Sequence, residues 1–154
     1  MTIIELIERP DIATDFKLNN LYLQFGSLLN ELRKKQLSQD TIDFINLSVE
    51  RINLSSFVGN ELRKLIKQEQ TLLLKQVEKA HKIAPKNYYR NLWMLLGFTA
   101  FGLPIGLLFG LSIGNTGLMG VGLPIGMAIG AGIGSSMDKK AFNDGRQLAI
   151  EVKY

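Results

Sequence analysis

The feature that most constrains this chain is a run of 47 residues, Asn91–Met137, without any charged side chain or histidine. Two mainly apolar stretches lie within it, at 92–113 and 118–137. Each is long enough to cross the roughly 30 Å of hydrocarbon in a bilayer. The four residues between them, Gly-Asn-Thr-Gly, form turns readily and can join only antiparallel neighbours. The sequence therefore predicts a helical transmembrane hairpin over 91–137.

Positive charges flank this run on both sides, whereas the connecting turn is uncharged. Such flanks remain in the cytoplasm. We therefore expect a multi-pass protein of the cell inner membrane, with both termini in the cytoplasm. Amphipathic rings and basic side chains favour the membrane interface. The residues expected there are Tyr88, Tyr89, Arg90, Trp93, Lys139 and Lys140. The alternative for the aromatic residues is simple packing against the soluble domain.

Burial inside a soluble protein is the alternative for the uncharged run. A chain of 154 residues offers too little polar surface to cover it. The first nine residues contain Glu5 and Glu8 and no leading Lys or Arg, unlike a signal peptide. The chain has no cysteine, which excludes disulfides, thiolate metal sites and a lipid-carrying N-terminal cysteine. The domain before the hairpin is therefore expected in the cytoplasm.

Glycines in the uncharged run recur at a helical spacing. Twelve of the chain's 15 glycines fall between positions 97 and 134, although each costs a helix about 1 kcal/mol relative to alanine. Two series repeat every fourth residue, which places each series along one face of a helix. Small-residue stripes of this kind let helix backbones approach closely in lipid. The predicted helix-packing residues are Gly102, Gly106, Gly110, Gly114, Gly122, Gly126, Gly130 and Gly134.

The two spans are copies of each other. Residues 102–114 match residues 122–134 at eight of thirteen positions, and Pro104 corresponds to Pro124. Each proline removes a backbone hydrogen bond and is expected to kink its helix. If one glycine stripe per span packs the hairpin on itself, a compact anchor is one interpretation. The remaining small residues favour a homo-oligomer, because they leave a second surface for a neighbouring subunit: Gly120, Ala128, Ala131 and Gly132.

The stretch Gly122–Leu148, GLPIGMAIGAGIGSSMDKKAFNDGRQL, resembles small bacterial glycine-zipper membrane-hairpin proteins. Those proteins share a glycine-rich double span, a Met-Asp-Lys-Lys-Ala segment and a Gly-Arg-Gln-Leu stretch. The resemblance covers about residues 95–150 and implies a membrane location. It implies nothing for the N-terminal domain, and it supplies no catalytic or ligand residues.

Residues 1–90 are expected to form a soluble all-α domain with two helical runs. The first covers about 11–36, and Asp11 or Thr14 can cap its start. The second covers about 39–84, where a proline follows.

Within the second run, Ile45-Asn-Leu-Ser48 repeats as Ile52-Asn-Leu-Ser55, which indicates a helix-packing seam. A small antiparallel bundle is the expected use of this seam, and oligomeric packing is the second. A break near Gly59 would shorten an improbably long helix. The short cytoplasmic tail, 138–154, is expected to continue helically for a turn or two and to stop near Gly145.

Residues that carry most enzyme chemistry are scarce. His81 is the only histidine, so neither a His-based triad nor a multi-histidine metal site can form. It is interpreted as a solvated residue near a helix end. The glycine run satisfies neither the dinucleotide-binding nor the phosphate-loop pattern. We therefore expect no enzyme activity, no cofactor and no metal. The net charge of +4 is spread thinly, so nucleic acid is not an expected partner.

These observations lead to one hypothesis and one alternative. In the hypothesis, the chain is an integral membrane protein that self-associates through its glycine-zipper hairpins. A pore or membrane-perturbing ring is one form of such an assembly, with a thin polar lining from Thr99, Ser112, Ser135 and Ser136. In the alternative, the hairpin only anchors a cytoplasmic helical module that binds a protein partner. The expected partners are the lipid bilayer, further copies of the chain and, in the alternative, that cytoplasmic protein.

Overall fold

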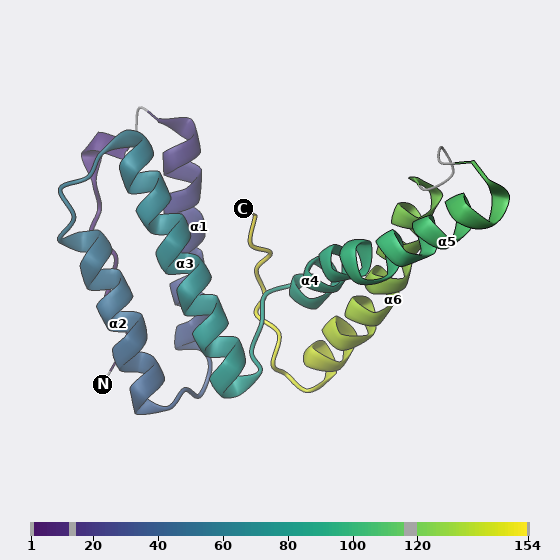
Figure 1. Ribbon diagram of the computed structural model, residues 1–154. Coiled ribbons are helices and arrows are strands. Elements are labelled where there is room, and N and C mark those ends of the chain that lie inside the picture. Colours follow the sequence, from purple (N-terminus) through teal and green to yellow (C-terminus); the bar gives the residue numbers. More distant parts are fainter. Residues whose placement is uncertain (1, 13–14, 116–119, 154) are drawn as a thin grey trace. The chain divides into compact units, whose positions relative to one another are not determined.

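The computed structural model describes residues 2–12, 15–115 and 120–153, with Asp11 described by its backbone only (Figure 1). It confirms the all-α class, since no β-strand occurs within these ranges. The chain divides into two compact units. Unit 1 comprises Met1–Ala84 and Leu148–Tyr154, and unit 2 comprises Pro85–Gln147.

Unit 1 contains three α-helices, α1 (Phe16–Arg33), α2 (Gln39–Asn53) and α3 (Gly59–His81) (Figure 1). Helix α3 packs against both others, parallel to α1 and antiparallel to α2. The run expected over 39–84 is thus two helices rather than one. Gly59 has a φ of +53°, a left-handed conformation that costs least in a residue without a Cβ. The chain therefore turns before α3 instead of continuing the helix.

Helix α1 is capped by Asp15. Its carboxylate Oδ1 accepts hydrogen bonds from the backbone N–H groups of Lys17 and Leu18, at 3.0 and 3.1 Å. Of the two caps expected from the sequence, Asp11 has its backbone in a short 3-10 helix, η1 (Pro10–Ile12), and Thr14 lies outside the described residues. Asp15 fits because an N-cap carboxylate reaches the free N–H groups of the second and third helical residues.

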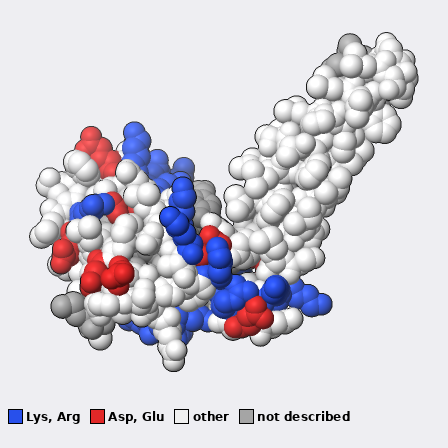
Figure 2. All heavy atoms as spheres, turned by 60° about the horizontal axis from the view of Figure 1, so that its bottom comes forward, with Lys and Arg blue, Asp and Glu red and all other residues white. Residues whose placement is uncertain are grey.

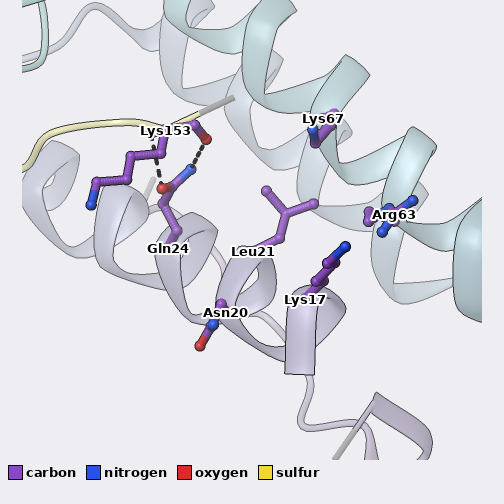
Figure 3. A pocket seen from close by; sticks show the side chains of 7 residues that line it. All are labelled: Lys17, Asn20, Leu21, Gln24, Arg63, Lys67 and Lys153. Atoms are coloured by element: carbon purple, nitrogen blue, oxygen red, sulfur yellow. Dashed lines mark hydrogen bonds between the residues drawn. The ribbon is translucent and has the colours of Figure 1, made fainter. Parts of the chain in front are cut away.

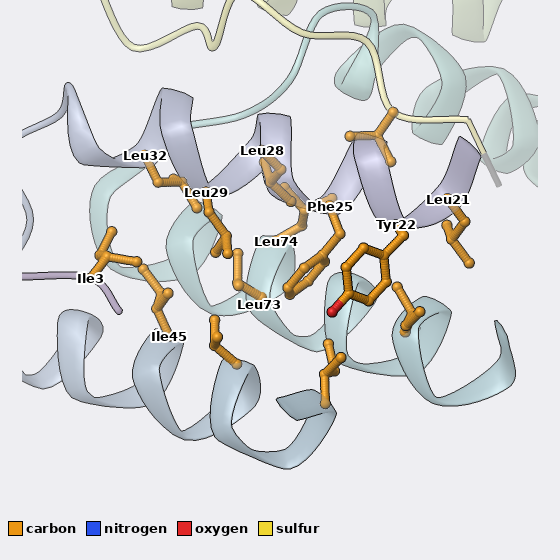
Figure 4. Close-up of a cluster of buried hydrophobic side chains, with 14 of the residues drawn as sticks. Ile3, Leu21, Tyr22, Phe25, Leu28, Leu29, Leu32, Ile45, Leu73 and Leu74 are labelled. Carbon is orange, nitrogen blue, oxygen red and sulfur yellow. The ribbon is translucent and has the colours of Figure 1, made fainter. Parts of the chain in front are cut away.

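The core of unit 1 is made of large apolar side chains from all three helices (Figure 4). Phe25, Leu28 and Leu32 of α1 are fully buried. So are the following residues of α2 and α3: Ile45, Val49, Ile52, Leu62, Ile66, Leu73 and Val77. Burying such a side chain stabilises a fold by about 1.5–3 kcal/mol. Unit 1 is therefore held together by side-chain burial.

The repeated Ile-Asn-Leu-Ser motif does two tasks on α2. Its isoleucines lie in the core, and its asparagines bind the N-terminal segment. The Asn46 side chain accepts from Ile4 N–H at 2.9 Å and donates to the Thr2 carbonyl at 3.2 Å. One repeat later, Asn53 accepts from Ile7 N–H and donates to the Glu5 carbonyl, both at 3.0 Å. The N-terminal segment thus lies along α2, held by four hydrogen bonds to the two asparagines.

The C-terminal residues return to unit 1 instead of forming a separate tail over 138–154. Residues 138–143 belong to a helix of unit 2, whereas Leu148 and Val152 are buried in the core of unit 1. The backbone N–H of Leu148 donates to the Ala84 carbonyl at 2.9 Å. Segment 85–147 is therefore an insertion whose two ends meet within unit 1.

Unit 2 is a helical hairpin. Its first arm runs continuously through α4 (Tyr88–Gly97), a π-helical turn η2 (Phe98–Gly102) and α5 (Leu103–Ile113). Its second arm is α6 (Gly122–Asn143), which lies alongside the first (Figure 1). Among the described residues, one stretch, Tyr88–Ile113, is long and apolar enough to cross a membrane. It starts before the 92–113 span read from the sequence, and residues 118 and 119 of the other span lie outside the described ranges.

Candidate functional site: a glycine seam between two helices

Glycines line the contact between the two arms of unit 2. We define the glycine seam as the eight buried glycines Gly97, Gly102, Gly106, Gly110, Gly122, Gly126, Gly130 and Gly134. A Cβ added to any of the four on α6 would lie less than 3.0 Å from backbone atoms of the facing arm, closer than real Cβ atoms come. The two backbones therefore touch, and no side chain fits between them.

The seam pairs residues in antiparallel order. Gly134 faces the backbone of Tyr89 and Arg90, and Gly130 faces that of Trp93. Gly126 and Gly122 then face the glycines of the first arm. Close backbone approach is the main source of helix association where no hydrophobic force acts between helices, as in lipid. The glycine stripes are thus used within the hairpin.

Gly97 belongs to the seam although the four-residue series does not include it. Its added Cβ would meet the Gly126 carbonyl and the Gly130 Cα. Five residues separate Gly97 from Gly102, and the π-turn between them has the i→i+5 repeat of that helix. The π-turn therefore returns the chain to the same face and extends the seam by one turn on the first arm.

The two prolines lie at positions where the missing backbone N–H interrupts no regular α-helical hydrogen bond. Pro104 is the second residue after the π-turn. Pro124 lies in the first turn of α6, where N–H groups have no intrahelical partner. Thr99 adds a donor in the same region, because its hydroxyl donates to the Leu96 carbonyl at 3.1 Å. Side-chain hydroxyls and helix adjustments of this kind satisfy the backbone near prolines in membrane helices.

Asp138 closes the open end of the hairpin and was not among the predicted site residues. It is 8% exposed, and its two carboxylate oxygens accept from Tyr89 N–H at 3.1 Å and from Arg90 N–H at 2.9 Å. These groups lie in the first turn of α4, whose own N-cap residue, Asn87, supplies no side-chain cap. A carboxylate of α6 thus caps α4 and complements its helix dipole.

Four described glycines of unit 2 lie outside the seam: Gly114, Gly120, Gly132 and Gly145, the last of which follows the end of α6 with a φ of +68°. Gly114, expected in the first stripe, ends α5 with a φ of +65° and has no neighbour that a Cβ would meet. It turns the chain rather than packing the arms. Gly120 and Gly132 are likewise exposed with nothing near.

A second row of small residues remains uncovered on α6. Ala128, Gly132 and Ser136 are all exposed at four-residue spacing, and we term them the small-residue face. Ala131, the other alanine noted in the sequence, is half-buried. The Ser136 hydroxyl donates to the Gly132 carbonyl at 3.1 Å, so its proton is satisfied within the helix.

The charged residues of unit 2 gather at one end of the hairpin, and the rest of its surface is uncharged (Figure 2). Of the residues expected at the membrane interface, Arg90, Lys139 and Lys140 are exposed at this end. Tyr88 and Trp93 are half-buried. Tyr89 is only 6% exposed, with its ring edge-on to that of Tyr88. Tyr89 is thus a packing residue at the base of the hairpin.

The single histidine of the chain lies in unit 1. His81, interpreted as a solvated residue, is half-buried, and its Nε2 lies 3.0 Å from Thr41 Oγ1 and 3.3 Å from Ser38 Oγ. It joins the end of α3 to the start of α2. No group of three His, Cys, Asp or Glu side chains that could hold a metal is found among the described residues.

No protein-family model, curated protein or solved structure matches this chain. The resemblance to glycine-zipper membrane proteins therefore stays a prediction from the sequence.

Proposed function

We propose that unit 2 is a membrane-embedded hairpin and that copies of the chain associate in the bilayer through the small-residue face of α6. The observation that carries this proposal is the division of the small residues into two rows. The glycine seam is covered by the hairpin itself, while the small-residue face has no partner within the described chain. Stripes of this kind are typical of helix–helix contacts in membranes.

Exposure supports the membrane placement. Large apolar residues of the first arm point outward, including Leu95 at 67%, Leu108 at 66% and Leu111 at 73% exposed. In the most apolar window of Tyr88–Ile113, only 22% is buried, whereas a core helix of a soluble protein would be mostly buried. Lipid is the environment that suits such a surface.

The place where the chain leaves unit 1 and returns to it supports locating both termini on the same side of the membrane. Ala84 and Leu148, which flank the inserted hairpin, share a hydrogen bond, so the chain leaves unit 1 and returns to it at the same place. The basic residues at the charged end of the hairpin favour the cytoplasmic side for that place.

Topology can be tested with single cysteines, since the chain has none. In intact cells, a membrane-impermeant maleimide should label Asn115→Cys, near the turn, and leave Gln68→Cys on α3 unlabelled until the cells are lysed. Labelling of both positions in intact cells, or of neither, would contradict the proposed orientation.

Association can be tested by mass in detergent. Gly132→Leu should reduce the oligomer to the monomer, because the new side chain blocks the small-residue face. Ile133→Leu, one position away and 37% exposed, is the matched control and should leave the mass unchanged. A monomeric native chain would overturn the self-association.

The proposed assembly is a packing of hairpins rather than a conduit. Two of the four hydroxyls available to line a pore, Thr99 and Ser136, donate to their own helix backbone. Proteoliposomes of the native chain should therefore retain an encapsulated dye, and rapid leakage would restore the pore hypothesis. On this proposal the protein acts by packing and not by catalysis.

The anchor alternative has its own supporting observation. The loop before α3 exposes Leu54 at 85%, Phe57 at 47% and Val58 at 61%, beside a cavity of about 480 Å³. Several large apolar side chains exposed together in this way are typical of an interaction site. If unit 1 on an unrelated membrane span retained the cellular activity, the anchor alternative would replace self-association.

A further inference from the structure

A cationic cavity lies on unit 1. Its volume is about 310 Å³, and Figure 3 shows Lys17, Arg63 and Lys67 grouped around Leu21. The remaining lining residues are Asn20, Gln24 and Lys153. The wall thus combines residues of α1, α3 and the C-terminal segment. It contains four cations, two amide side chains and no carboxylate.

The cations of this cavity have no counter-charge paired with them among the residues that the structure describes. None of the four forms an ion pair with any described residue, whereas Arg51 and Lys34, elsewhere on unit 1, each pair with a glutamate. Arg63 and Lys67 are four residues apart on α3, a spacing at which like charges destabilise a helix. The fold therefore keeps an unfavourable charge arrangement at one place, and a bound anion would relieve it.

The side-chain amide of Gln24, which lines the cavity, forms three hydrogen bonds. The Gln24 side chain donates to the Lys153 carbonyl and accepts from the Lys153 N–H, both at 3.0 Å. It also donates to Oε1 of Gln70, which is fully buried, at 3.1 Å. Gln24 thus joins the C-terminal segment to α1 and α3.

We propose that this cavity, lined by Lys17, Arg63, Lys67 and Lys153, binds a phosphate-bearing anion. Arg63 supplies the planar donor group that binds two phosphate oxygens at once, and the lysines supply flexible point charges. The phosphate can belong to a soluble molecule or to the headgroup of an anionic lipid. This inference concerns unit 1 alone and is independent of self-association by unit 2.

The experiment uses the full chain with one reporter. Asn20→Cys places a unique thiol at the rim of the cavity, and an environment-sensitive fluorophore attached there should report occupancy. One arm titrates inorganic pyrophosphate against the protein in detergent with neutral headgroups. The other arm compares nanodiscs of phosphatidylcholine with nanodiscs that also contain phosphatidylglycerol, without added phosphate.

Charge-matched triple variants identify the site. Lys17→Gln, Arg63→Gln and Lys67→Gln remove three lining cations. The control triple removes three cations of α3 outside the cavity, Lys64, Lys75 and Lys79, also by change to Gln. The cavity triple should weaken binding by at least about tenfold and the control by less than about twofold, since charge-assisted phosphate contacts are strong and local.

The two titrations distinguish a soluble phosphate ligand from a lipid headgroup. A pyrophosphate response that the cavity triple abolishes supports a soluble phosphate ligand. A response to phosphatidylglycerol alone, again lost in the cavity triple, supports a lipid headgroup. No response in either arm, or equal weakening in both triples, overturns the proposal. Circular dichroism of each variant checks that its helices persist.

Discussion

The two units of this chain pack helices by opposite means. In unit 1 the helices are separated by large side chains, and Phe25, Ile45 and Leu73 are fully buried between them. In unit 2 the arms meet backbone to backbone at the glycine seam, while leucines such as Leu108 and Leu111 point outward. One unit buries its large residues, and the other displays them.

If unit 2 lies in a bilayer, as proposed, this difference follows from the solvent around each unit. In water, removing apolar side chains from the solvent stabilises a fold by roughly 25 cal/mol per Å². In a bilayer the lipid tails are as apolar as leucine, so burying leucine gains little and close backbone contact decides the packing. The contrast between the units is what the proposed division of the chain between cytoplasm and membrane predicts.

The largest expected effect tests this contrast with one substitution in each unit. Leu73→Ala, in the core of unit 1, should lower the free energy of unfolding by about 2–5 kcal/mol, because it leaves a cavity. Leu108→Ala, 66% exposed on unit 2, should change it by less than about 0.5 kcal/mol. Hydrogen exchange of each unit in detergent measures both. A large cost at Leu108 would show that it lies in a side-chain core after all.

The next largest effect is expected when a single methyl group is added to α6, either inside the glycine seam or outside it. Gly130→Ala should destabilise the hairpin by about 2–4 kcal/mol, because its Cβ would overlap the Trp93 carbonyl. Gly132→Ala, with open space around it, should be neutral or stabilising by up to about 1 kcal/mol through helix propensity. Exchange rates of α4 amides provide the measurement. Equal effects at the two positions would contradict backbone contact in the glycine seam.

Much of this architecture is readable from the sequence, because it depends on regular spacing. The four-residue glycine series identifies seven of the eight glycines of the seam. The repeat at Ile45 and Ile52 identifies two fully buried core residues. Periodicity predicts which face of a helix is buried, and this part of the fold needs no other information.

The remainder depends on contacts between distant residues or on irregular backbone. Gly97 is offset by five residues, so only the π-turn brings it into the seam. From the sequence alone, Asp138 is only a polar residue that follows a predicted span. Its role in capping α4 can be recognised only when the neighbouring helix end is known. Asn46 and Asn53 look like exposed positions of a helix until the N-terminal segment is placed along them.

A smaller effect concerns the cap that joins the two arms of unit 2. Asp138→Ala should cost about 1–2 kcal/mol, because the N–H groups of Tyr89 and Arg90 lose their acceptors. Asp144→Ala is the matched control, since Asp144 is 43% exposed and its side chain pairs with Arg146. Exchange at Tyr89 and Arg90 should rise only in the first variant. Unchanged exchange there would show that the arms are held by the glycine seam alone.

The smallest effect is a pH dependence confined to unit 1. The pKa of Glu31 is lowered from its ordinary value of 4.5, first by the hydrogen bond from Lys34 and then by the bond from the Ala149 N–H. Because the folded pKa lies below the unfolded one, the ionised carboxylate stabilises the attachment of the C-terminal segment. That contribution is complete above pH 4.5 and is lost as the pH falls through the lowered value.

Exchange of the Ala149 amide, which donates to Glu31 Oε2 at 2.9 Å, measures this contribution. After correction for intrinsic exchange, its protection should fall on acidification, while protection in the glycine seam stays constant because no ionisable group lies there. Glu31→Gln should remove the pH dependence at Ala149 and leave a slightly weaker bond, by less than about 1 kcal/mol since the pair is near the surface. If the variant kept the same acid dependence, a group other than Glu31 would hold the C-terminal segment, and the contrast with the uncharged glycine seam would rest on packing alone.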